Sequence, residues 1–134
     1  MKKVKKLVVI ASEDLLIINQ MSSILRENDY STLIEKSATK AILKIMEQEI
    51  NLLILDLDSS GNFNTDLIKI IKKIRPRLLI VVLTKDNSLE TIRKFIQAGV
   101  FYCVLKPIQI VEINRLLEAV SRHYQKERKV GNTI

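Results

Sequence analysis

Five short apolar runs alternate along the chain with longer segments whose apolar residues recur at helical spacing. The runs, which read as strands, cover residues 4–11, 30–35, 51–56, 78–83 and 101–105. The intervening helical segments cover residues 14–28, 38–49, 65–74, 88–98 and 109–126. Stretches such as 52–55 and 79–83 are apolar at every position, which is typical of parallel strands covered by helices on both faces. The sequence therefore predicts a (βα)5 doubly wound domain of the α/β class, with a five-stranded parallel sheet.

A chain of 134 residues is long enough for one such domain and too short for two. We expect the domain to cover residues 1–126, with 127–134 as a basic C-terminal tail or the start of a linker. No apolar run is long enough to cross a bilayer, and no signal sequence is apparent, so we expect a cytoplasmic protein with no membrane contact. The single cysteine, Cys103, lies in an apolar run and is expected to be a core residue.

The net charge of +7 comes from 22 Lys and Arg against 15 Asp and Glu. These basic residues are spread along the chain, and no aromatic residues are interleaved with them to stack on bases. Direct binding of nucleic acid is therefore not expected.

Residues with reactive side chains follow the predicted strands: Glu13 the first, Asp56 the third, Thr84 the fourth and Lys106 the fifth. In a doubly wound sheet the carboxyl ends of the strands lie at one edge, where ligands bind. A carboxylate nucleophile, a hydroxyl donor and an ammonium group suit phosphoryl transfer, in which charge develops on the phosphoryl oxygens. The sequence predicts that these side chains meet.

These motifs resemble the receiver domain of two-component response regulators, in order and spacing. The resemblance covers residues 4–124 and rests on four segments: VVIASE at 8–13, LILDL at 53–57 with Gly61 following, VLT at 82–84 and LKP at 105–107. It implies a flavodoxin-like receiver fold and a signalling role, not that of an enzyme. Asp56 would accept a phosphoryl group, Thr84 would act as the switch hydroxyl, and Lys106 would pair with the phosphoryl charge.

The same resemblance implies a sensor histidine kinase or a phosphotransfer protein as partner, with a small acyl phosphate as another possible donor. It also implies possible homodimers through the fourth helix, the fifth strand and the fifth helix. Mixed charges suited to symmetric pairing lie on those helices: Arg93, Lys94, Arg115 and Glu118.

The sequence departs from the family pattern at the end of the first strand, where receivers usually carry two adjacent acidic residues that hold magnesium. Here the pair is Ser12 and Glu13, so one carboxylate is missing. We expect a weakened Mg²⁺ site with Glu13, Asp56 and the backbone carbonyl of Asp58 as ligands. A second register, with Ala11 and Ser12 at the pair, would remove both acids.

Three further positions are atypical or ambiguous. Lys85 follows the switch hydroxyl, where the family prefers a small residue; it either lies on the surface or extends its ammonium to Asp56. Asp58 could orient a water that hydrolyses the acyl phosphate, or simply face solvent. Cys103 stands where receivers often carry the aromatic residue that moves with the switch hydroxyl.

Two alternatives remain beside a phosphorylated receiver. A degenerate receiver would share the fold and act as a protein-interaction module without phosphorylation. The segment LDLDS at 55–59 also resembles the first motif of haloacid-dehalogenase-type phosphohydrolases, but no acidic metal-binding motif follows Lys106.

Overall fold

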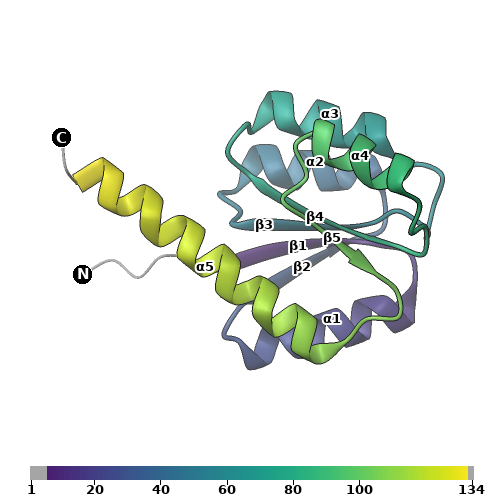
Figure 1. Ribbon diagram of the computed structural model, residues 1–134, viewed down its shortest axis with the longest axis horizontal. Helices are drawn as coiled ribbons and strands as arrows, with labels where there is room; N and C mark the ends of the chain where they lie inside the picture. Colours follow the sequence, from purple (N-terminus) through teal and green to yellow (C-terminus); the bar gives the residue numbers. More distant parts are fainter. Residues whose placement is uncertain (1–5, 133–134) are drawn as a thin grey trace.

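Five parallel strands form one sheet in the order β2-β1-β3-β4-β5. The computed structural model describes residues 6–132, with side chains up to Glu127 (Figure 1). The strands are β1 Leu7–Ala11, β2 Ser31–Glu35, β3 Leu52–Asp56, β4 Leu79–Thr84 and β5 Tyr102–Leu105. The helices are α1 Leu15–Glu27, α2 Ala38–Glu47, α3 Thr65–Ile74, α4 Leu89–Gln97 and α5 Ile110–Asn132. The predicted (βα)5 architecture is confirmed.

Helices α1 and α5 cover one face of the sheet, and α2, α3 and α4 cover the other (Figure 1). Strand β1 shows why its sequence is apolar throughout: Val8 and Ile10 pack into the core beneath α1 and α5, while Val9 and Ala11 pack into the opposite core. Every residue of β1, β3 and β4 is buried. The sheet is therefore the buried central layer from which the loops at its carboxyl edge project.

Each of the first four helices begins after a polar residue whose side chain accepts a hydrogen bond from the first turn. These N-cap residues are Asp14, Ser37, Asn64 and Ser88. Such capping satisfies backbone N–H groups that have no partner inside the helix, so these residues fix where each helix starts. The predicted first and fourth helices began at the caps themselves, one residue too early.

Helix α5 ends at Asn132, six residues beyond the predicted end at Lys126. Residues 125–129 are Gln, Lys, Glu, Arg and Lys, which favour helix, and the first glycine after them is Gly131. The division into a domain of 1–126 and a tail of 127–134 stays a prediction. Val4 and Lys5 of the predicted first strand lie outside the described residues, as do Thr133 and Ile134.

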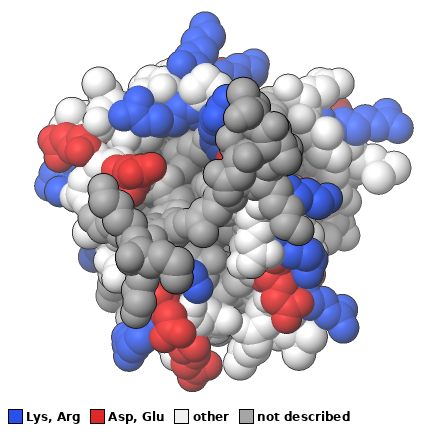
Figure 2. All heavy atoms as spheres, turned by 90° about the vertical axis from the view of Figure 1, so that its left-hand side faces the viewer, with Lys and Arg blue, Asp and Glu red and all other residues white. Residues whose placement is uncertain are grey.

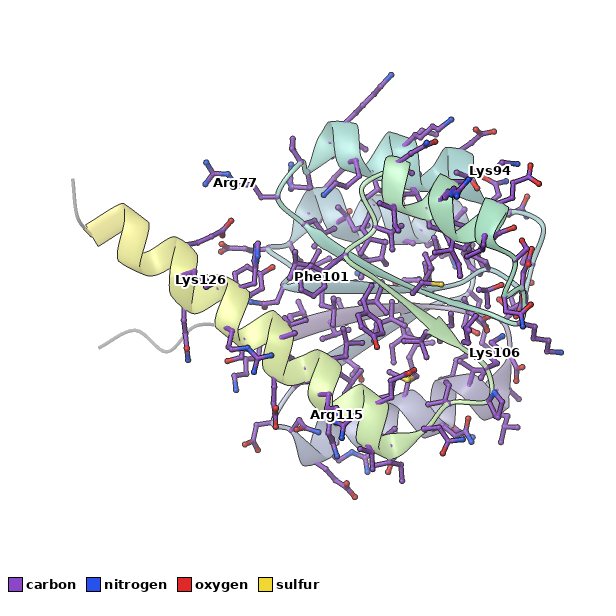
Figure 3. All side chains as sticks on the ribbon, viewed as in Figure 1. Arg77, Lys94, Phe101, Lys106, Arg115 and Lys126 are labelled. Atoms are coloured by element: carbon purple, nitrogen blue, oxygen red, sulfur yellow. The ribbon has the colours of Figure 1, made fainter. Side chains whose placement is uncertain are left out.

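Figure 2 shows the face opposite the end of the sheet where Figure 3 labels Lys106, and on it the basic side chains of the described residues do not gather into one patch. The visible Lys and Arg side chains are distributed around the rim of this face, with Asp and Glu between them. In residues 6–132, no helix is long and apolar enough to cross a membrane.

We predict that Ile54→Ala lowers the free energy of unfolding by about 2 to 5 kcal/mol, because Ile54 is fully buried in the central strand β3 and its loss leaves a cavity. Ile70→Ala on α3 is the matched control: Ile70 is 47% exposed, so the change should stay within about 0.5 kcal/mol. Urea unfolding of the three proteins measures both. Equal effects of the two substitutions would contradict this account of the core.

Candidate functional site

The parallel register brings the chemically reactive residues to one edge of the sheet. Ala11 of β1 lies opposite Leu55 of β3, Asp56 opposite Leu83 of β4, and Thr84 opposite Leu105 of β5. The residues at the strand ends, Ser12, Asp56, Thr84 and Lys106, are therefore neighbours. Figure 3 labels Lys106 at this end of the molecule.

Asp56 is the centre of this edge and is fully buried. The Lys106 ammonium lies 2.6 Å from its Oδ1, and Ser12 Oγ donates to its Oδ2 at 2.8 Å. The backbone N–H of Asp58 donates to Oδ1 at 3.3 Å. A buried carboxylate is tolerated only when it is paired and hydrogen-bonded, and each oxygen of Asp56 has such a partner.

Lys106 extends from the end of β5 and joins two carboxylates. Its ammonium contacts Asp58 Oδ2 at 3.2 Å in addition to Asp56, and its side chain is only 9% exposed. Burial alone would lower the pKa of Lys106, but the hydrogen bonds and charges of Asp56 and Asp58 outweigh it and raise the pKa above the usual value. The lysine is therefore a fixed positive charge at neutral pH.

The side chain of Asp58 points into the site, toward β4. Its Oδ1 accepts from Thr84 Oγ1 at 3.2 Å, and its Oδ2 accepts from the backbone N–H of Lys85 at 2.7 Å. Thr84 is buried at the end of β4. The sequence prediction gave Asp58 a backbone role, a water-orienting role or none, and it missed this carboxylate contact.

Two loop residues that the sequence prediction missed hold the edge together. Ser59 Oγ donates to the Asp56 carbonyl and accepts from the backbone N–H of Glu13, each at 3.1 Å, so it joins the loops after β1 and β3. Asp86 accepts from Ser88 N at 2.9 Å and from Thr91 Oγ1 at 2.7 Å, and its own N–H donates to Thr84 Oγ1. These hydrogen bonds lower the pKa of the Asp86 carboxyl. The only sequence signal for either residue was a polar loop beside a strand end.

The side chain that reaches Asp56 from the first strand is Ser12, which is fully buried, while Glu13 is exposed. Within the described part of the chain, Glu13, Asp56 and Asp58 do not form a cluster of three metal-binding side chains. Of the two residues, Ser12 therefore lies beside Asp56, and no hydrogen bond or ion pair described in the structure joins the Glu13 side chain to Asp56. The role of Glu13 as a metal ligand stays a prediction.

Lys85 contributes its backbone N–H to the site, and its side chain is exposed. Among the described residues no ion pair joins its ammonium to Asp56; Lys106 holds that position. Cys103 is half-buried on β5 and packs against the core beneath α4. Burial, with smaller effects of Glu112 and Asp86, raises the pKa of its thiol, which therefore stays protonated at neutral pH.

The proposed pairing surface is partly visible in the structure. Arg93 and Lys94 lie exposed on α4, and Arg115 and Glu118 lie exposed on α5; Figure 3 labels Lys94 and Arg115. Self-association through these helices and β5 stays a prediction.

Comparison with known proteins agrees with this geometry. The chain matches the response regulator receiver domain over residues 8–120. It belongs to the receiver domain family of response regulators. It is 27% identical over 117 residues to the two-component response regulator ORR12 of Oryza sativa subsp. japonica, covering 84% of this chain and 96% of that protein.

Solved structures show the same fold. A CheY-like receiver domain protein from Methanospirillum hungatei matches with a TM-score of 0.81 and 22% identity, over 92% of this chain and 99% of the other. NtrX from Brucella abortus matches with a TM-score of 0.87 and 20% identity, over 98% of this chain but only 30% of NtrX. The shared fold therefore accounts for nearly all of the first crystallised chain and for less than a third of the second.

This receiver domain is a component of two-component signal transduction. Members of the family interact with histidine kinases or phosphotransfer proteins, serve in general as signalling modules and not as enzymes, and generally bind Mg²⁺ at the acidic site. The site described above holds the buried carboxylate, hydroxyl and lysine that the sequence motifs predicted to meet.

We predict that Lys106→Met lowers the free energy of unfolding by about 3 kcal/mol at pH 7, because it leaves the buried Asp56 carboxylate without its counter-ion. Lys85→Met, which removes an exposed ammonium, should change it by less than about 0.5 kcal/mol. Adding Asp56→Asn to Lys106→Met should recover part of the loss. Urea unfolding measures all four proteins.

The pKa of Lys106 is raised on folding, so its stabilising effect is complete below the unfolded value of about 10.4 and falls as pH rises through the higher folded value. The difference in stability between wild type and Lys106→Met should thus be constant from pH 7 to about pH 9 and shrink only above about pH 10.5. A difference that already vanishes below pH 9 would rule out a charged Lys106 as its cause.

Proposed function

We propose that this receiver domain accepts a phosphoryl group on Asp56 from a sensor histidine kinase, a phosphotransfer protein or a small acyl phosphate. The observation that carries the proposal is the buried Asp56 carboxylate held by the Lys106 ammonium at 2.6 Å. In the transfer, an Asp56 oxygen forms a bond to phosphorus as the bond to the donor breaks. The donor group leaves with the electron pair.

Lys106 and Thr84 have separate roles in this scheme. Lys106 already contacts Asp56 and Asp58, so its charge stabilises the negative oxygens of a phosphoryl group on Asp56. The Thr84 hydroxyl lies at the end of the neighbouring strand and can donate one hydrogen bond to that group. The hydrogen bond that Thr84 donates therefore depends on whether an anion is present in the site.

Magnesium binding is expected to be weak. The hard oxygens of Asp56 and Asp58 suit an ion that keeps most of its waters, but Ser12 replaces the carboxylate beside Asp56 and the Glu13 side chain is exposed. The ligands we propose are Asp56, the backbone carbonyl of Asp58 and Glu13. When bound, magnesium adds positive charge at the phosphoryl oxygens.

The alternative, an interaction module that works without phosphorylation, has one specific observation in its favour. All four carboxylate oxygens of Asp56 and Asp58 accept contacts from protein donors, so the site is internally satisfied without a ligand. The haloacid-dehalogenase interpretation loses its support, because the receiver match spans residues 8–120.

We predict that Asp56→Asn abolishes phosphoryl uptake from acetyl phosphate, because the amide keeps the size of the side chain but is no longer a nucleophile. Intact mass spectrometry measures the added phosphoryl group. Asp66→Asn is the control, since Asp66 is an exposed acid in the first turn of α3 and its loss changes the net charge equally. Uptake that survives in Asp56→Asn would place the acceptor elsewhere and overturn the proposal.

We predict that Ser12→Asp strengthens magnesium binding at least tenfold. The new carboxylate would lie beside Asp56 Oδ2, where Ser12 Oγ is now 2.8 Å away, and the repulsion between two buried carboxylates is relieved by a dication. A tenfold gain needs only about 1.4 kcal/mol. Magnesium titration by calorimetry measures it.

Lys85→Ala is the matched control for this titration, because the Lys85 side chain is exposed and makes no described ion pair with either carboxylate. It should shift magnesium affinity by less than about threefold, as expected for a solvent-screened charge. Tight binding by the wild type, or an unchanged affinity in Ser12→Asp, would show that Ser12 is not what weakens the site.

A further inference from the structure

Three donors from two strand ends converge on the carboxylate of Asp58. Thr84 Oγ1 donates to Oδ1 at 3.2 Å, the Lys85 backbone N–H donates to Oδ2 at 2.7 Å, and the Lys106 ammonium lies 3.2 Å from Oδ2. A hydroxyl, a backbone amide and an ammonium group aimed at one point form a binding site for an oxyanion. In this chain the oxyanion is part of the protein.

This anion site adjoins the phosphoryl acceptor. The same Lys106 ammonium contacts Asp56 Oδ1 at 2.6 Å and Asp58 Oδ2 at 3.2 Å, so one positive charge bridges the two carboxylates. A phosphoryl group on Asp56 would need the donors that Asp58 now occupies. It would also bring further negative charge next to the Asp58 carboxylate.

We propose that Asp58 is a positioning residue that fills the phosphoryl-oxygen site of the unmodified protein. Its carboxylate holds the Thr84 hydroxyl in the inward position that a phosphoryl group on Asp56 would otherwise stabilise. Phosphorylation then requires the Asp58 side chain to leave. Because that side chain is 26% exposed, it has a path to solvent that does not disturb the core. This inference rests on the proposed function, since it assigns the regulation of the same site.

The contact is linked to the start of α4 through one hydroxyl. Thr84 Oγ1 donates to Asp58 and accepts from the backbone N–H of Asp86 at 3.1 Å. The Asp86 carboxylate in turn accepts from the backbone of Ser88, the N-cap of α4, and from Thr91 in its first turn. An anion on Thr84 therefore orders the loop between β4 and α4, whichever residue supplies it.

Charge also favours the resident carboxylate over an added anion. Asp56 and Asp58 together carry two negative charges against the single positive charge of Lys106 in the contacts described. Removal of the Asp58 carboxylate would leave one negative charge, on Asp56, and one positive charge, on Lys106. It would also make the Thr84 hydroxyl, the Lys85 amide and the Lys106 ammonium available to an added oxyanion. A free inorganic phosphate should then bind where it is now excluded.

The first experiment measures phosphate affinity without any chemistry. In an Asp56→Asn background, which removes the nucleophile, we compare proteins with and without Asp58→Ala by titrating inorganic phosphate and following the Lys85 amide by NMR. The Asp58→Ala protein should bind phosphate at least tenfold more tightly. Alanine keeps the backbone carbonyl proposed as a metal ligand, and Asp58→Asn is a second variant that keeps the side chain's size and loses its charge.

Asp66→Ala in the same background is the matched control, because it removes an exposed acid on the neighbouring helix α3 and should change phosphate affinity by less than about twofold. Equal affinities with and without the Asp58 carboxylate would overturn the proposal. A gain shared by Asp66→Ala would also overturn it, since the effect would then be one of net charge alone.

The second experiment measures the switch. Amide hydrogen exchange at Lys85 and Asp86 should be at least tenfold faster in Asp58→Ala than in wild type, and saturating phosphate should restore protection. Unchanged exchange would contradict the positioning role of Asp58. Faster exchange without recovery of protection in phosphate would also contradict it, because Asp58 would then be only a structural contact. The two proposals can fail separately. If these results hold but acetyl phosphate modifies none of the proteins that retain Asp56, phosphorylation of Asp56 is wrong and the positioning role of Asp58 is still supported.

Discussion

The ion pair between Lys106 and Asp56 is the contact on which the rest of the site depends. Asp56 is fully buried at the end of the central strand, and a carboxylate in that position destabilises the fold unless a positive charge lies against it. Lys106 supplies that charge from β5 across the end of β4, and this is possible because the parallel register sets the strand ends level. The same charge reaches Asp58, so the position of one lysine fixes both acids.

Much of this arrangement could be predicted from the sequence. The continuous apolar runs identified the parallel strands, and the polar residue that follows each run identified the edge at which they end, so Asp56, Thr84 and Lys106 were placed correctly beside one another. These positions depend on strand register alone. The hydrophobic pattern fixes the strand register, and this pattern can be read directly from the sequence.

The loop residues could not be placed by the same reasoning. Ser12 and Glu13 are consecutive, and no sequence pattern indicates that the Ser12 side chain points inward to Asp56 while the Glu13 side chain points to solvent. The direction of the Asp58 side chain depends on the loop between β3 and α3, where Ser59 joins two loops through its hydroxyl. Loop directions follow from a few local hydrogen bonds and leave no periodic signal in the sequence.

The serine at position 12 and the inward carboxylate of Asp58 can be described together as a change in where the negative charge lies around Asp56. Receivers usually place their additional carboxylates beside the first strand, where they attract a cation to Asp56; this chain has a serine hydroxyl there instead. Its additional carboxylate, Asp58, lies on the opposite side, against Thr84, the Lys85 amide and Lys106. A carboxylate on the first side helps to bind magnesium. A carboxylate on the second side competes with phosphate for the same donors. In the proposed scheme, moving the additional carboxylate from one side of Asp56 to the other weakens the metal site and fills the anion site at the same time, with no change in the fold.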